Sequence, residues 1–218
     1  MVIVQMFKDG GEFMYPILVC AIFAMAITFE RLFYIVFRAN INATAFMAQI
    51  QKLVMANNID RAIKLCNAEP HAALPQVVKA GLTRANRTEK EIENAIEEAT
   101  LAITPVLNKR TNYLAMLANI STLIGLLGTI MGLVQAFEAV AHASAEMKQT
   151  LLAAGISVAM FTTAAGLVAA IPTLVAHSII TTRTNKILDD VDQYGLKTLN
   201  LLTARRRGTL KEDAAAGA

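Results

Sequence analysis

Three long apolar stretches constrain the fold of this 218-residue chain more than any other feature of its sequence. The first runs from Met14 to Phe37, interrupted only by Glu30 and Arg31. The second (111–137) and the third (149–182) contain no Asp, Glu, Lys or Arg. About 20 apolar helical residues cross a hydrocarbon core of roughly 30 Å, so each stretch is long enough to span a membrane. The composition agrees, since 55% of the residues are hydrophobic and only 17% are charged.

The chain is therefore predicted to be an all-α membrane protein with three transmembrane helices and long cytoplasmic helical extensions. The first stretch is a retained helix, because it lacks a basic leader, exceeds the length of a signal-peptide core and precedes no A-x-A-like cleavage site. The predicted segments are a periplasmic N-terminus (1–13), transmembrane helix 1 (14–37), a cytoplasmic helical insert (38–112), transmembrane helix 2 (113–137), a periplasmic loop (138–148), transmembrane helix 3 (149–182), a cytoplasmic extension (183–207) and a disordered tail (208–218).

The distribution of basic residues predicts the orientation of these helices. Only Lys8 precedes the first span and only Lys148 lies between the second and third, whereas all other Lys and Arg lie at the end of the first span, in 38–110 or after Thr182. Because basic residues are retained in the cytoplasm, the N-terminus should be periplasmic and the C-terminus cytoplasmic. Positive-inside anchoring near anionic lipid is the favoured reading of the cluster Arg205 to Arg207 over a binding site, and no nucleic acid is required.

The cytoplasmic insert is expected to be helical. Pro70 and Pro75 are expected to break it into short helices. Thr88 and Glu91 form a T-x-x-E capping box that should start a further helix. Pro105 should kink this helix, which could then continue through Lys109 and Arg110 into the second span.

Small and hydroxyl residues recur every three or four positions in the second and third spans, so each set follows one helix face. The second span carries Thr122, Gly125, Thr129, Gly132 and Ala136, and the third carries Gly155, Ala159, Thr163, Gly166, Ala170 and Thr173. His177 continues the second stripe toward a possible cytoplasmic exit. Two interpretations are open: the stripes line a narrow wet path, or the threonines bond to the preceding turn while the glycines tighten packing.

No carboxylate lies near the middle of a predicted span, since Glu30 and Glu138 fall near span ends. A threonine hydroxyl exchanges hydrogen bonds but cannot hold a proton as a charge near neutral pH. If the chain conducts protons, another polypeptide must supply the ionisable group. The sequence shows no nucleophile paired with a base, no nucleotide-binding loop and no cluster of metal ligands. We therefore expect that the chain is not an enzyme and binds neither a metal nor a cofactor.

Several motifs resemble the MotA/TolQ/ExbB proton-channel family, most closely its TolQ/ExbB branch. They are Gly125-Leu-Leu-Gly-Thr-Ile-Met-Gly132, Gly155-Ile, Thr163-Ala-Ala-Gly-Leu-Val-Ala-Ala-Ile-Pro172 and Phe29-Glu-Arg-Leu. The resemblance implies a bacterial inner-membrane location and a pentameric ring around a dimer of ExbD/TolR-like single-span proteins, each with an intramembrane Asp. It also implies that Thr129 and Thr163 line the proton pathway.

The remaining candidate residues serve the pore stripe and helix packing. They are Thr122, Gly125, Gly128, Gly132, Ala159, Thr162, Gly166, Ala170 and Pro172. One position departs from the family pattern: ExbB and TolQ usually carry a glutamate five residues before the third-span threonine, and here that position is Val158. A mechanism that depends on that carboxylate cannot be transferred to this chain.

The leading functional hypothesis is a proton-channel subunit of an inner-membrane motor that converts proton-motive force into mechanical work on the cell envelope. Ton, Tol, gliding and secretion systems are all compatible with the sequence. The alternative, from a different class, is a passive membrane scaffold that holds a single-span partner.

Overall fold

The computed structural model describes the backbone of residues 11–216 and the side chains of residues 11–208. Within these bounds the chain folds into helices that form two compact units. One unit comprises residues 1–31 and 110–180, and the other comprises residues 32–109 and 181–218. The predicted N-terminal segment falls largely on residues 1–10, which lie outside the described residues.

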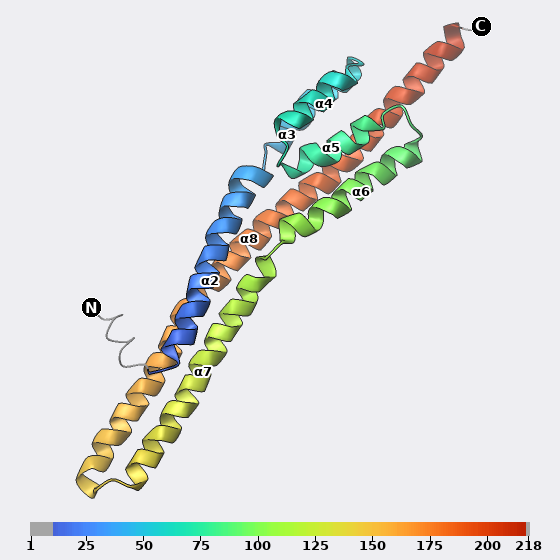
Figure 1. Cartoon of the computed structure of the whole chain (residues 1–218). Coiled ribbons are helices and arrows are strands. Elements are labelled where there is room, and N and C mark those ends of the chain that lie inside the picture. The colour runs from blue at the N-terminus through green and yellow to red at the C-terminus, as the bar shows by residue number, and fades with distance from the viewer. Residues whose placement is uncertain (1–10, 217–218) are drawn as a thin grey trace. The chain divides into compact units, whose positions relative to one another are not determined.

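The first unit contains α2 (Met14–Phe33), α7 (Thr111–Ala141) and the first half of α8 (Ala145–Ala216). Figure 1 shows α7 and this half of α8 as an antiparallel pair joined by a short turn, with α2 beside α8. Among the described residues, three helices are long and apolar enough to cross a membrane. Large apolar side chains such as Phe23, Leu123 and Met160 are more than half exposed, as expected when lipid is the solvent. The predicted all-helical class with three long apolar helices is confirmed.

The second unit contains α3 (Ala43–Met55), α4 (Ile59–Ala68), α5 (Ala73–Thr83), α6 (Glu89–Asn108) and the second half of α8. The chain enters it through the π-helical segment η1 (Tyr34–Ala39), which continues from α2. Asn42 and Asn58 accept hydrogen bonds from backbone amides and thereby cap α3 and α4. The core side chains come from all five helices and include Ile50, Val54, Ala62, Val77, Val78, Leu82, Ile92, Ile187, Val191 and Leu202.

The insert between the first and second spans agrees with the local sequence signals in part. The capping box is present: Thr88 Oγ1 accepts from the Glu91 amide, and the Glu91 carboxylate accepts from the Thr88 amide. Pro75, however, lies inside the first turn of α5, where a missing amide hydrogen costs no intrahelical bond. Of the two prolines expected to break the insert, only Pro70 lies in a break.

The junction between α6 and α7 also differs from its prediction. Pro105 lies within α6, which continues to Asn108, and the helix is interrupted at Lys109 and Arg110 instead of running through them. Arg110 adopts a left-handed conformation with φ of 61°. A continuous helix cannot contain such a residue, so the insert and the second span are separate helices.

Between the second and third spans, α7 continues to Ala141 and α8 begins at Ala145, so much of the segment predicted as a periplasmic loop (138–148) is helical. At the other end, α8 continues as helix to Ala216 through most of the segment 208–218, for which the sequence predicts disorder. Residues 217–218 and the side chains after Gly208 lie outside the described part of the chain.

Candidate functional site

The two small-residue stripes meet in the contact between α7 and α8. A Cβ atom added at Gly125 would lie 3.1 Å from the carbonyl oxygen of Thr162, and one added at Gly132 would lie 3.2 Å from the Ala159 Cβ. At Gly166 it would lie 2.7 Å from the Ser121 carbonyl oxygen. The approach at Gly166 leaves no room for a side chain, and those at Gly125 and Gly132 are tight, which is how small residues act between membrane helices.

Thr163 links the two helices through its side chain. Its Oγ1 donates a hydrogen bond of 3.2 Å to the carbonyl oxygen of Gly125, 38 positions earlier in the chain. The side chain is partly buried. Because a hydroxyl donates once and accepts twice, Thr163 Oγ1 retains acceptor capacity while its proton is held by α7.

Thr129 and Thr122 lie at the edge of the same contact. Thr129 Oγ1 donates to the Leu126 carbonyl at 2.6 Å, and Thr122 Oγ1 donates to the Ala118 carbonyl at 3.1 Å. Thr122 is exposed and Thr129 is half-buried. Both hydroxyls thus bond back to their own helix, yet both stay accessible from outside the protomer.

Other predicted stripe residues are packing positions within one chain. Thr162 is 1% exposed and donates to the Ala159 carbonyl at 2.8 Å. A Cβ added at Gly128 would lie 2.8 Å from the Thr162 side chain. Ala159 and Ala170 are also buried. For these positions the structure realises the close-packing interpretation that the sequence left open.

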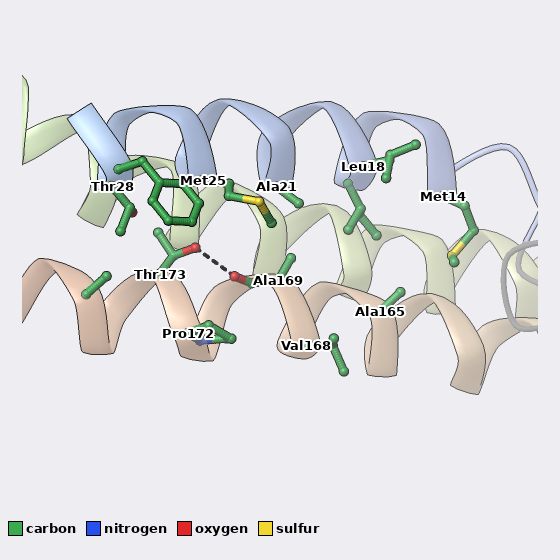
Figure 2. A pocket seen from close by; sticks show the side chains of 13 residues that line it. Met14, Leu18, Ala21, Met25, Thr28, Ala165, Val168, Ala169, Pro172 and Thr173 are labelled. Carbon is green, nitrogen blue, oxygen red and sulfur yellow. Dashed lines mark hydrogen bonds between the residues drawn. The ribbon is translucent and has the colours of Figure 1, made fainter. Parts of the chain in front are cut away.

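Pro172 belongs to a different surface, an apolar groove between α2 and α8 with a volume of about 620 Å³. Figure 2 shows Met14, Ala21 and Met25 of α2 across this groove from Ala165 and Ala169 of α8, and Pro172 also lines it. The two polar residues that line it are Thr28 and Thr173, and Thr173 Oγ1 donates to the Ala169 carbonyl at 2.8 Å. Because none of its lining residues titrates, this groove cannot relay protons by itself.

The structure also locates three other residues singled out by the sequence. His177, on the face that carries Thr173 one turn earlier, is half-buried. Val158, where the family glutamate is replaced, is half-buried as well. Its Cγ1 would lie 3.7 Å from a Cβ added at Gly11, so this side chain faces the segment just before α2. Glu30 forms an ion pair with Arg110.

One residue of the contact was missed from the sequence. Ser121 is 2% exposed, donates from Oγ to the Leu117 carbonyl at 2.9 Å, and presents its own carbonyl to Gly166. Its position four residues before Gly125 could have placed it on the stripe. No group of three or more His, Cys, Asp or Glu side chains that could hold a metal ion occurs in the described part of the chain.

Comparison with known proteins identifies the family. A family model described as the MotA/TolQ/ExbB proton channel family matches residues 69–193. The chain is 25% identical over 216 residues to the biopolymer transport protein exbB1 of Vibrio cholerae, covering 96% of this chain and 91% of that protein.

Two further relatives agree with this assignment. A putative biopolymer transport protein of Synechocystis, ExbB-like 3, is 30% identical over 173 residues, which is 78% of this chain and 80% of that protein. The Tol-Pal system protein TolQ of Haemophilus influenzae is 39% identical over 88 residues, 40% of this chain and 38% of that protein. With three apolar helices and small-residue stripes packed as described, the chain is a multi-pass membrane protein that belongs to the MotA/TolQ/ExbB proton channel family.

Proposed function

We propose that this chain is the proton-channel subunit of an inner-membrane motor that converts proton-motive force into mechanical work on the cell envelope. Copies of the chain form a ring, with five copies expected, around two single-span helices of an ExbD/TolR-like partner. The N-terminus is periplasmic and the second unit is cytoplasmic. Each proton that crosses supplies about 2.3 kcal/mol per 100 mV of membrane potential.

The observation that carries this proposal is the pair of hydroxyls at the α7–α8 contact, in apolar stretches (111–137 and 149–182) that contain no Asp or Glu. Thr163 Oγ1 bridges to the Gly125 carbonyl and keeps acceptor capacity, and Thr129 is half-buried at the edge of the contact. Both side chains can receive a hydrogen bond from a protonated carboxyl on a neighbouring helix. The titrating Asp therefore comes from the partner, and the two threonines order the path beside it.

Val158 limits which family mechanisms apply. A carboxylate at this position would lie on the side of α8 that faces Gly11, and valine cannot bind or release a proton. Transport in this chain therefore relies on the partner's carboxyl group without a second acid at position 158.

The test is proton flux in liposomes that contain the chain and its single-span partner, with an imposed membrane potential and a pH-sensitive dye inside. Thr129→Val and Thr163→Val keep the side-chain shape and remove the hydroxyl, so each should lower flux at least about tenfold. Thr129→Ser and Thr163→Ser should retain most of it. Thr28→Val, which removes a hydroxyl from the α2 side of the apolar groove, is the matched control and should conduct normally.

Full flux in both valine variants would overturn the proposal. A wild-type chain that co-purifies with the partner but conducts no protons would favour the passive scaffold instead. Co-purification of each variant with the partner separates lost conduction from lost assembly.

A further inference from the structure

Basic side chains gather at one end of the unit formed by residues 32–109 and 181–218. Arg84 and Arg87 lie at the turn between α5 and α6, and α8 contributes Arg205 to Arg207. Arg205 donates through Nε to Asn57 Oδ1 at 2.9 Å, and Arg206 donates through Nη1 to the Arg87 carbonyl at 3.0 Å. These hydrogen bonds fix the positively charged part of α8 beside the turn between α5 and α6, so that several guanidinium groups lie close together at the surface.

Anchoring to lipid does not account for this cluster. The positive-inside effect is strongest within roughly 15 to 20 residues of a span. Arg205 lies 23 positions beyond Thr182, the last residue of the third uncharged stretch. Arg207 pairs with Glu89 at the first residue of α6, and α6 then extends over about 30 Å to Asn108, near the exit of the chain from this unit. The cluster therefore lies at the end of the unit opposite to Lys109.

A cavity of about 190 Å³ opens within this cluster, lined by Glu89, Ile92, Thr203, Arg206 and Arg207. Thr203 Oγ1 is buried and has no hydrogen-bond partner among the described residues. The Arg207 guanidinium approaches the Glu89 carboxylate only to 3.6 Å, longer than a charge-assisted hydrogen bond. A hydroxyl donor beside guanidinium groups is a suitable environment for an incoming oxyanion.

We propose that the Arg84, Arg87 and Arg205–Arg207 cluster is a docking surface for an acidic protein segment, one carboxylate of which enters the cavity beside Thr203 and Arg207. The incoming carboxylate replaces Glu89 at Arg207 and accepts the hydrogen bond that Thr203 Oγ1 lacks. This docking surface lies outside the α7–α8 contact and does not depend on proton conduction.

The charges and size of the site favour a carboxylate over a phosphate. Glu89 and Glu91 lie beside the arginines, so a dianionic phosphate or a nucleic acid would meet stronger repulsion than a single carboxylate, which carries one negative charge. The cavity is also smaller than the roughly 300 to 1,000 Å³ typical of pockets for nucleotide-sized ligands. A single Asp or Glu side chain of a polypeptide carries one negative charge and is small enough for the cavity.

The test uses the full chain in nanodiscs of phosphatidylcholine and a fluorescein-labelled peptide of eight glutamates, with binding followed by anisotropy. The Arg206→Gln/Arg207→Gln double variant should bind at least about tenfold more weakly than the wild type. Arg183→Gln/Lys186→Gln, which removes the same charge from exposed positions on α8, should change affinity less than about threefold. Higher salt should weaken wild-type binding.

Thr203 provides the test of the cavity itself, because substitutions there leave the net charge unchanged. Thr203→Val should weaken binding severalfold and Thr203→Ser should restore it. The proposal is overturned if the wild type does not bind the peptide, if both double variants lose affinity equally, or if Thr203→Val binds as the wild type does. Arg206- and Arg207-dependent binding to phosphatidylglycerol vesicles or single-stranded DNA in preference to the peptide would likewise overturn it.

Discussion

Glu30, at the end of the first span, and Arg110, at the start of the second, form an ion pair across 80 positions of sequence. Arg110 Nη1 donates to both carboxylate oxygens of Glu30 at 2.5 and 2.6 Å. Arg110 also has a left-handed backbone, with φ of 61°. The pair thus joins α2 to the residue that directly precedes α7.

Substitution at Arg110 should separate the effect of the backbone from that of the charge. A left-handed conformation costs a non-glycine residue about 1 kcal/mol or more, and a half-exposed ion pair contributes at most about 1 kcal/mol. Arg110→Gly should therefore be close to neutral, whereas Arg110→Ala should be less stable than Arg110→Gly by about 1 kcal/mol. Apparent thermal unfolding midpoints in one detergent would check this order.

A double-mutant cycle with Glu30→Gln and Arg110→Gln would measure the pair itself. We expect a coupling energy of about 0.5 to 1 kcal/mol that falls as salt is added. Additive effects of the two substitutions would show that the pair contributes nothing to stability.

Close packing of α7 against α8 should make Gly166 intolerant of even a methyl group. A Cβ there would lie 2.7 Å from the Ser121 carbonyl oxygen, so the helices must move apart. Gly166→Ala should destabilise the first unit by about 1 to 3 kcal/mol. Gly208→Ala is the matched control, since no atom of the described residues lies within 4 Å of the added Cβ and its midpoint should equal or exceed that of the wild type. Equal stability of both variants would contradict the observed packing.

Contacts between residues that are far apart in the sequence could not be predicted from the sequence alone. Apolar length alone located the three long apolar helices, and the local pattern of Thr88 and Glu91 gave the start of α6. The pairing of Glu30 with Arg110 has no local signature, because it depends on how α2 and α7 pack together. The expected continuation of the helix through Lys109 and Arg110 failed for the same reason: the interruption lies at Arg110, where an ion pair and the helix start coincide.

The stripe residues show a second limit. Helical spacing placed Gly125, Thr163 and Gly166 on the correct faces, but spacing cannot distinguish a face that packs inside one chain from a face that lines a path between chains. The contact geometry separates the buried Thr162 from the half-buried Thr129. Pro172, which the sequence grouped with the pore stripe and the helix-packing positions, lines the groove that α8 forms with α2, because a helix has several packed faces.

The capping box should give the second unit a specific sensitivity to acid. The Thr88 side chain and backbone both hydrogen-bond to Glu91, and with Arg87 and Arg84 nearby they lower the pKa of Glu91 from its ordinary value of 4.5. Because the folded pKa lies below the unfolded one, this stabilisation is present above pH 4.5 and is lost as the pH falls through the folded pKa. The difference in unfolding midpoint between the wild type and Glu91→Gln should be largest at pH 7 and should shrink below pH 4.5.

Glu98→Gln is the control for that series, since it removes an exposed carboxylate of the same helix that forms no capping box. It should show no comparable pH-dependent difference. Thr88→Ala should reduce the acid sensitivity, because it removes the hydroxyl that holds the Glu91 carboxylate. A constant difference between the wild type and Glu91→Gln from pH 7 to pH 3.5 would contradict this assignment.

The thiol of Cys66 should report local opening of the second unit. Cys66 is 2% exposed, and burial raises its pKa from 9.0 to about 11. The thiolate is the reactive form, so at pH 8 its population should be about a hundredfold lower than in an unperturbed thiol. In a Cys20→Ser background, the rate of maleimide labelling of Cys66 in the folded chain, followed by mass spectrometry, should be at least about a hundredfold lower than in the unfolded chain. Ala62→Gly, which removes a buried methyl one turn earlier on α4, should loosen the packing and speed labelling. Labelling of the folded chain at the rate of an exposed thiol would mean that α4 does not pack as described.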